Sequence, residues 1–206
     1  MAKALGEGRE GFEQTIHSNG LEECVRLGVE ATDWYAKRGR LNGAREGPVR
    51  RGIGMAVMAH GSGIAGLDMG AATLKMNDDG SFNLLIGATD IGTGSDTILA
   101  QMAAEELGVT LDEMIVYSSD TDFTPFDKGA YASSTTYISG GAVRKAARAV
   151  GDQIRRHAAT MLGARVEARN DVEGSLALAD IELRDKKAWF PDGRSVSLEQ
   201  VALSSL

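Results

Sequence analysis

The residues whose types and spacing best suit ligand binding or catalysis lie between Thr89 and Thr136. A glycine-bracketed turn, TDIGTGSDT, opens onto a predicted helix, and a second polar segment, SSDTDFTPFDKGAYASSTT, ends where the next helix is expected. Glycine turns and helix N-termini expose backbone N–H groups, which suit phosphates and other anions. Two such loops facing each other would form a polar cleft for an extended, phosphate-containing ligand.

Taken alone, both loops are open to a plainer interpretation. A dinucleotide fingerprint needs a third glycine where Thr97 stands, and no Walker lysine follows the turn. The GTG turn is therefore as typical of an ordinary strand-to-helix connection as of a phosphate cradle, and the second loop equally fits a capped connection. The histidines, His17, His60 and His157, have no acid at a local spacing that suggests a catalytic relay.

Composition excludes several classes of protein. The net charge of −7 argues against nucleic-acid binding, because a basic excess is needed to displace counterions. No apolar run is long enough to span a membrane, and the N-terminus lacks the apolar core of a signal peptide, so we expect a soluble cytoplasmic domain. The lone Cys24 excludes an internal disulfide and a cysteine-ligated iron–sulfur cluster within this chain. We interpret Cys24 as a buried structural thiol.

Hydrophobic periodicity predicts the elements that lead to the first loop. Asn19 is placed to cap a helix from Leu21 to about Lys37, which ends at Gly39. The segment Gly52–His60 is continuously apolar or small, as a strand buried on both faces would be. The runs MGAATLKM and SFNLLIGA flank a polar turn, NDDG, and predict a β-hairpin.

The remaining elements connect and follow the two loops. Ser95 or Thr93 is expected to cap a helix that Gly108 closes, and EMIVYSS predicts a short strand. A long helix is expected from about Ser139 to Leu162. Its arginines are interpreted as a solvated face: Arg144, Arg148, Arg155 and Arg156. The tail predicts a second hairpin around LALADIEL and KAWF, with PDG as a turn, and a capping box, SLEQ, that starts a last helix. Hairpins mixed with crossovers indicate an α+β fold with a mixed sheet and packed helices.

The two loops and their flanks resemble the large, molybdenum-binding subunit of the xanthine dehydrogenase/aldehyde oxidase family. The matching text is RRGIGMA, then GATDIGTGSDTILAQMAAEELGV, then DTDFTPFDKGAYASSTTYISGGAVRKAA. The resemblance covers roughly Arg50 to Ala149 and is closest to the bacterial type with separate subunits. It implies a molybdenum-cofactor-binding-domain-like fold and a molybdopterin cofactor in its cytosine dinucleotide form.

The resemblance also implies which residues bind the cofactor. In the family the first turn lies beside the molybdenum centre, which assigns Gly92, Thr93 and Gly94 to cofactor binding. Thr93 stands where the family has a glutamine that contacts the cofactor. The threonine side chain is shorter, so we expect this contact to be lost or to be mediated by water. The second loop holds the pterin dinucleotide through backbone amides and hydroxyls. The matching residues are Gly129, Ala130, Tyr131, Ala132, Ser133 and Thr135. Tyr131 departs from the alanine of some relatives and is expected to shape the substrate side. No residue is assigned as catalytic or as a direct metal ligand.

By the same resemblance, the chain is part of a molybdenum hydroxylase, an oxidoreductase that hydroxylates an N-heterocycle or an aldehyde with oxygen from water. The 2Fe–2S clusters and FAD are then carried by partner chains. The family's catalytic glutamate and the upstream half of the subunit have no counterpart here, so we expect an inactive fragment that forms homodimers through uncovered apolar faces. We interpret residues 1–206 as a single partial domain, with 1–18 poorly ordered and 50–150 as the core cofactor-binding segment. The alternative is a non-catalytic scaffold or assembly module that keeps the fold without metal.

Overall fold

The computed structural model describes residues 2–3, 15–16, 18–41, 47–58, 60–62, 68–167 and 176–205. The chain separates into two compact units, Met1–Ala59 and His60–Leu206. The expectation for residues 1–18 falls almost entirely outside the described residues.

The first unit contains two short helices and a pair of two-residue strands. The strands β1 (Ala2–Lys3) and β2 (Thr15–Ile16) pair antiparallel. The Asn19 side chain accepts a hydrogen bond from the Leu21 N–H at 3.0 Å, but Gly20, and not Asn19, occupies the N-cap position. The single helix predicted to Lys37 is wrong, because Asp33 takes a left-handed conformation (φ 51°) and divides it into α1 (Leu21–Thr32) and α2 (Trp34–Leu41). Gly39 lies inside α2 rather than ending a helix.

Two further expectations for this unit are wrong. The segment 52–58 forms no strand, and only Ile53 in it is half-buried. A buried strand needs neighbours that pair with its backbone, and none of the strand pairs among the described residues includes this segment. Four of its residues instead share a shallow groove with α1 (lined by Leu21, Cys24, Val25, Gly28, Met55, Ala56, Val57 and Met58). Cys24 is exposed, since no residue of α1 is buried in this unit.

The second unit is built on a mixed three-stranded sheet, as the pattern of hairpin and crossover predicted. The strands β3 (Ala72–Met76) and β4 (Phe82–Ile86) form the predicted antiparallel hairpin. The strand β5 (Met114–Ser118) pairs parallel to β4, which gives the order β3-β4-β5. The crossover between the parallel strands is α3 (Ser95–Leu107), followed by a short 3₁₀ turn, η1 (Leu111–Glu113).

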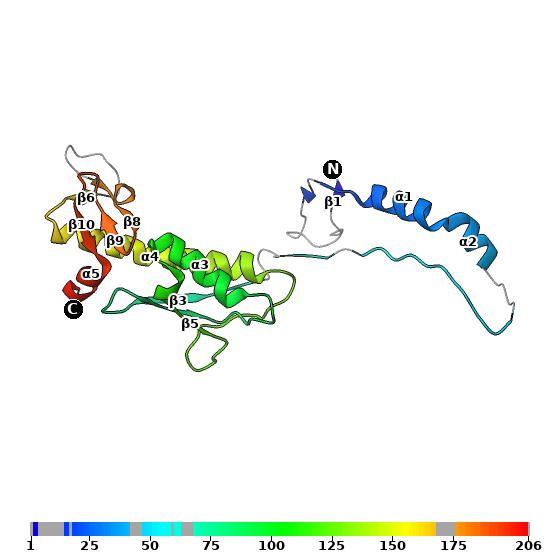
Figure 1. The fold of residues 1–206 in the computed structure, drawn as a ribbon, viewed down its shortest axis with the longest axis horizontal. Coiled ribbons are helices and arrows are strands. Elements are labelled where there is room, and N and C mark those ends of the chain that lie inside the picture. The colour runs from blue at the N-terminus through cyan, green and yellow to red at the C-terminus, as the bar shows by residue number, and fades with distance from the viewer. Residues whose placement is uncertain are drawn as a thin grey trace. The chain divides into compact units, whose positions relative to one another are not determined.

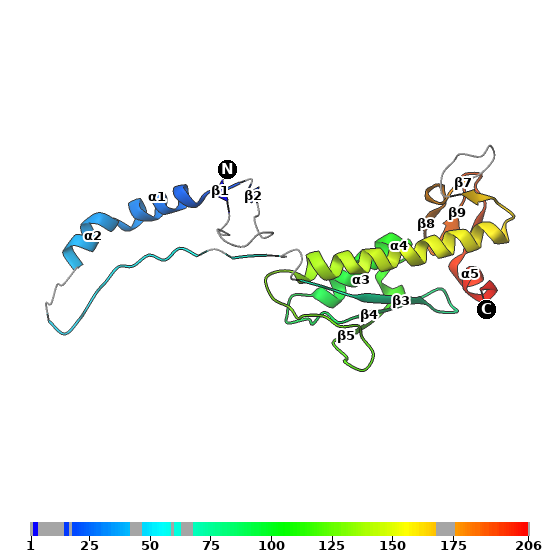
Figure 2. The ribbon, with the colours of Figure 1, turned by 180° about the vertical axis from the view of Figure 1, so that it is seen from behind.

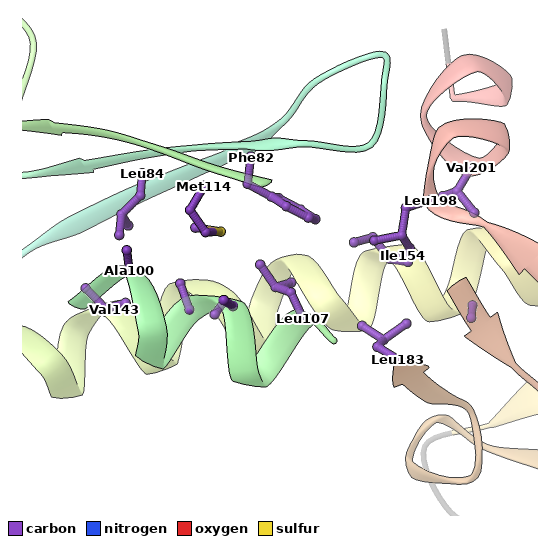
Figure 3. Close-up of a cluster of buried hydrophobic side chains, with 14 of the residues drawn as sticks. Phe82, Leu84, Ala100, Leu107, Met114, Val143, Ile154, Leu183, Leu198 and Val201 are labelled. Atoms are coloured by element: carbon purple, nitrogen blue, oxygen red, sulfur yellow. The ribbon is translucent and has the colours of Figure 1, made fainter. Parts of the chain in front are cut away.

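Two helices cover one face of this sheet (Figures 1 and 2). Residues of β4 alternate between buried and half-buried, so that Phe82, Leu84 and Ile86 are fully enclosed. Phe82 and Leu84 point toward α3 and the long helix α4 (Thr135–Met161), where Leu107 and Val143 are also buried (Figure 3). The apolar side chains of α4 are buried at Val143, Ala147, Ile154 and Ala158, whereas Val150 is half-buried and Met161 is exposed.

The C-terminal half of α4 packs against a small second sheet. Its order is β10-β9-β8, all antiparallel, built from β8 (Glu182–Arg184), β9 (Lys187–Trp189) and β10 (Ser195–Ser197). The predicted capping box is confirmed, because Ser197 and Gln200 exchange hydrogen bonds at the start of α5 (Leu198–Ser204). The remaining elements are β6 (Val166–Glu167), which pairs parallel to β7 (Leu176–Ala177), and the 3₁₀ turn η2 (Leu178–Asp180).

The prediction of a solvated arginine face is confirmed for Arg144, Arg148 and Arg156, which are exposed, and wrong for Arg155. Arg144 and Arg148 both bond to Glu106 of α3, at 3.0 and 3.2 Å. Burial alone would raise the pKa of Glu106, but the hydrogen bonds from Arg148 and Arg144 outweigh it and lower that pKa. The Arg155 side chain is 19% exposed and donates to the Ile181 carbonyl at 2.9 Å, because the small sheet covers that part of the helix. In the part of the chain that the structure describes, no helix is long and apolar enough to cross a membrane.

Candidate functional site

The two predicted loops leave the sheet at the same edge. Because β4 and β5 are parallel, their carboxyl ends lie side by side, with Ile86 opposite Ser118. The Ser119 N–H donates to the Ile86 carbonyl and the Ser119 hydroxyl to the Ala88 carbonyl, both at 3.3 Å. The carboxyl edge of parallel strands is where α/β sheets bind ligands. The fold therefore brings segments 87–94 and 119–134 into one place.

The backbone N–H groups of the GTG turn are already engaged. The Asp90 carboxylate accepts hydrogen bonds from the N–H groups of Gly92, Thr93 and Gly94, at 2.8, 2.9 and 3.2 Å. The expectation of free N–H groups at this turn is therefore wrong, since the chain supplies its own anion. The N–H of Gly92 has the largest effect in lowering the pKa of Asp90, and the N–H groups of Gly94, Asp96 and Thr93 add to it. What the turn still offers a ligand is the exposed Thr93 side chain.

The start of α3 contains buried polar atoms without partners. Gly94, not Ser95 or Thr93, occupies the N-cap position, and no side chain caps the helix. The Ser118 hydroxyl donates to Asp96 Oδ2 at 3.0 Å, which ties the end of β5 to the first turn of α3. The Ser95 hydroxyl and Asp96 Oδ1 are buried and have no partner among the described residues. Buried polar atoms of this kind are normally satisfied by water or a ligand.

The second loop has an unusual backbone between Gly129 and Ser134. Gly129 has φ 106°, and Ala132 and Ser133 have φ 49° and 52°, in the left-handed region. Such a conformation costs about 1–3 kcal/mol for each non-glycine residue, so the surroundings must maintain it. Part of the support is internal, because both the N–H and the hydroxyl of Ser134 donate to the Tyr131 carbonyl, at 3.1 and 2.8 Å. Ala130 lies half-buried within this bend.

The helix that follows this loop begins with open donors. Helix α4 starts at Thr135 instead of near Ser139, and no side chain caps it. Its first backbone bond runs from the Ile138 N–H to the Ser134 carbonyl at 2.7 Å. Within the described residues, the N–H groups of Thr135, Thr136 and Tyr137 have no acceptor. Aligned peptide dipoles place positive charge at this end of the helix, so α4 offers the anion-binding donors that the GTG turn lacks.

Tyr131 connects the same loop to another part of the unit. Its ring is 47% exposed, and its hydroxyl hydrogen-bonds to the Asp68 carboxylate. That hydrogen bond is the main cause of a raised pKa for Tyr131, with burial and the charges of Asp68 and Asp127 adding to it. The oxygen of the protonated phenol can accept a further hydrogen bond.

The residues present fit a ligand that approaches the backbone closely. A Cβ added at Gly92, Gly94 or Gly129 would meet no atom within 4 Å, so open space borders both loops. Among the described residues, no three His, Cys, Asp or Glu side chains gather in a metal-ligating group. The arrangement is suited to holding an organic, phosphate-bearing group through backbone donors and hydroxyls.

Sequence reasoning missed the carboxylates that organise these loops. Asp90 and Asp127 each stand two residues before a glycine whose N–H they accept. An aspartate two residues ahead of a glycine is a recognised turn signal, so the sequence contained the pattern that predicts these two contacts. The partner Ser139, by contrast, had no local signal, because its contact with Asp127 spans the whole loop.

Comparison with known proteins identifies the class. The sequence family of the molybdopterin cofactor-binding domain matches this chain over residues 27–204. The chain belongs to this family, and it is a molybdopterin-binding domain of the xanthine dehydrogenase/aldehyde oxidase type.

Individual relatives agree with this assignment. A putative xanthine dehydrogenase molybdenum-binding subunit of Escherichia coli (strain K12) is 38% identical over 168 residues, which is 80% of this chain and 22% of the relative. A probable hypoxanthine oxidase of the same strain is 39% identical over 161 residues, covering 78% of this chain and 16% of the relative. The crystal structure of quinoline 2-oxidoreductase from Pseudomonas putida 86 superposes with a TM-score of 0.55 at 25% identity, over 66% of this chain and 16% of that one. The chain thus spans about a fifth of the length of the curated relatives it matches.

Proposed function

We propose that the chain holds part of the molybdopterin cofactor at the carboxyl edge of β4 and β5. The observation that most directly supports this proposal is the uncapped start of α4, which follows the left-handed residues Ala132 and Ser133. The backbone N–H groups of this stretch, with the hydroxyls of Ser133 and Thr135, would bind the phosphates of the cofactor. Gly129 and Ala130 would allow close approach, and Tyr131 would border the substrate side.

The GTG turn has a different role in this proposal. Asp90 already engages the N–H groups of the turn, so these would not bind the cofactor. Gly92 and Gly94 would instead leave room for the cofactor on the side opposite the α4 donors, where the Thr93 hydroxyl would contact it. When bound, the cofactor supplies oxygen-transfer and redox chemistry at molybdenum. The residues of this chain hold it and exclude water around it. We propose residues 50–150 as the core segment for this task within a single partial domain.

The whole protein is proposed to hydroxylate an N-heterocycle or an aldehyde with oxygen derived from water. The names of the relatives support the heterocycle, since they include a xanthine dehydrogenase subunit and a hypoxanthine oxidase. We further propose the cytosine dinucleotide form of the cofactor, a cytoplasmic location, and partner chains that carry 2Fe–2S clusters and FAD. The name of the xanthine dehydrogenase relative, a molybdenum-binding subunit, supports partner chains.

The isolated chain is proposed to be inactive and to form homodimers. It covers about a fifth of its relatives, and Met55, Val57 and Met58 are 44%, 58% and 81% exposed beside α1. Exposed apolar patches usually mark an interface. We expect no turnover of xanthine or an aldehyde with an artificial electron acceptor. We expect a dimer in sedimentation at micromolar concentration, and a monomer would contradict the second expectation.

Substitution of Ala132 tests cofactor binding. The protein, purified with its partner chains from a host that makes the cofactor, should contain molybdenum. Ala132→Phe should reduce the molybdenum content about tenfold or more, because the bulky ring would fill the space beside the α4 donors. The matched control is Thr121→Phe, an exposed position of the same loop. Wild-type molybdenum content in Ala132→Phe would refute the assignment. A folded wild-type protein that takes up no molybdenum would instead favour a non-catalytic scaffold.

A further inference from the structure

Asp127 connects the loop between β5 and α4 to the helix that follows it. Its Oδ1 accepts a hydrogen bond from the Gly129 N–H at 2.8 Å, and its Oδ2 accepts one from the Ser139 hydroxyl at 3.0 Å. Ser139 lies in the second turn of α4 and is 4% exposed. One carboxylate thereby joins the two ends of segment 129–139, which contains the proposed phosphate-binding donors.

Two glycines show how closely the surroundings enclose this carboxylate. At Gly87, directly after β4, an added Cβ would lie 2.2 Å from the Pro125 carbonyl oxygen and 2.8 Å from the Asp127 Cβ. At Gly70, an added Cβ would lie 2.8 Å from both the Cα and the hydroxyl of Ser139. Asp127 and its partner are therefore held between the end of β4 and the segment that precedes β3.

The segment that Asp127 spans contains two residues with an unfavourable backbone conformation. The left-handed residues Ala132 and Ser133 lie between its two contacts, and left-handed conformations persist only where neighbours over-determine them. Both Asp127 oxygens already accept a hydrogen bond from a donor of this chain. The carboxylate is thus suited to shaping the loop and not to binding the ligand itself.

We propose that Asp127 is a positioning residue, which forms the 129–134 bend and aligns the α4 donors before the cofactor arrives. The inference rests on the proposed cofactor-binding function and extends it. A preformed loop pays no ordering entropy on binding, so its loss weakens retention of the cofactor without removing any group that touches it.

Hydrogen exchange in the cofactor-free protein tests this directly. The variant is Asp127→Ala, and the matched control is Asp120→Ala, because the one partner of the Asp120 carboxylate among the described residues is the Asp122 N–H of its own turn. In Asp127→Ala, exchange at the amides of Gly129, Tyr131 and Ser134 should accelerate about tenfold or more, as expected for losing hydrogen bonds to a charged group. The amides of β4 should keep their protection, and Asp120→Ala should change neither set.

A conservative variant separates positioning from a general structural role. In Asp127→Asn the amide oxygen still accepts from Gly129, and its NH₂ group can donate to the Ser139 hydroxyl. We expect this variant to restore both slow exchange and molybdenum content, whereas Asp127→Ala loses about nine-tenths of the metal when produced in a cofactor-making host. If the β4 amides also lose their protection in Asp127→Ala, Ser139→Ala is used as the test variant instead. We expect the same effects on exchange and molybdenum content, but smaller ones.

The outcomes distinguish this inference from the function on which it rests. Unchanged exchange in the 129–134 bend of Asp127→Ala would overturn the positioning role, and so would faster exchange with full molybdenum content. Wild-type protein without molybdenum would overturn the proposed function, while the exchange data would still report whether Asp127 forms the bend.

Discussion

Replacement of Gly108 by alanine should destabilise the second unit far more than the same change at Gly163. Both glycines follow the C-terminal ends of helices in left-handed conformations, with φ 67° and 64°. An alanine in this conformation costs about 1–2 kcal/mol through its own backbone. That cost is common to the two positions, so their difference isolates the packing around Gly108.

The packing contribution follows from the distances. A Cβ at Gly108 would lie 2.1 Å from the Leu183 carbonyl oxygen and 2.2 Å from its carbon, whereas the same atom at Gly163 meets nothing within 4 Å. Unbonded carbon atoms rest about 3.5–4 Å apart, so strand β8 would have to move by more than about 1 Å. The Lys186 N–H, which donates to the Gly108 carbonyl at 3.0 Å, would move with it. Overpacking of this kind adds about 1–3 kcal/mol or more.

We therefore expect losses of about 3–5 kcal/mol for Gly108→Ala and about 1–2 kcal/mol for Gly163→Ala. The assay is urea unfolding followed by tryptophan fluorescence. The chain has two tryptophans, so a Trp34→Phe background leaves Trp189 of β9 as the sole reporter on the small sheet. Equal losses in the two variants would refute the reasoning, because they would mean that α3 and β8 do not approach as closely as the structure has them.

Three further changes test the core, an ion pair and a helix cap. Phe82→Ala should cost about 3–5 kcal/mol in urea unfolding because Phe82 is fully buried, whereas Phe123→Ala, at a side chain that is 72% exposed, should change stability by less than about 0.5 kcal/mol. Glu106→Gln should lower stability by about 0.5–1 kcal/mol at neutral pH. Since the folded pKa of Glu106 lies below its ordinary 4.5, this difference should be complete above that value and disappear as the pH falls through the folded pKa, and a difference constant down to pH values near 2 would contradict the assignment. Ser197→Ala should cost about 1 kcal/mol by removing the cap of α5, and hydrogen exchange of the Gln200 amide should accelerate with it.

Local sequence patterns were sufficient for the elements whose contacts are local. The polar turn before Ser81 predicted the β3–β4 hairpin, and Gly108 predicted the end of α3. The Ser197 capping box predicted the start of α5. In each case the residues that interact are separated by only a few positions, so their identities and spacing contain the relevant physics. The family resemblance was also carried by continuous stretches of sequence, and the match to residues 27–204 confirmed it.

The tertiary structure decided which groups of the candidate site are free to act. The parallel pairing of β4 with β5 brings the two loops to one edge, and neither strand's own sequence specifies that pairing. The Asp90 contacts with the GTG turn are local, whereas the contacts of Ser118 with Asp96 and of Asp127 with Ser139 join residues far apart in sequence. The same limit explains the absence of the predicted strand at 52–58, since an apolar run becomes a strand only where another chain segment pairs with its backbone. Hydrogen-bond partners and burial depend on residues far away in sequence, so only the folded arrangement determines them.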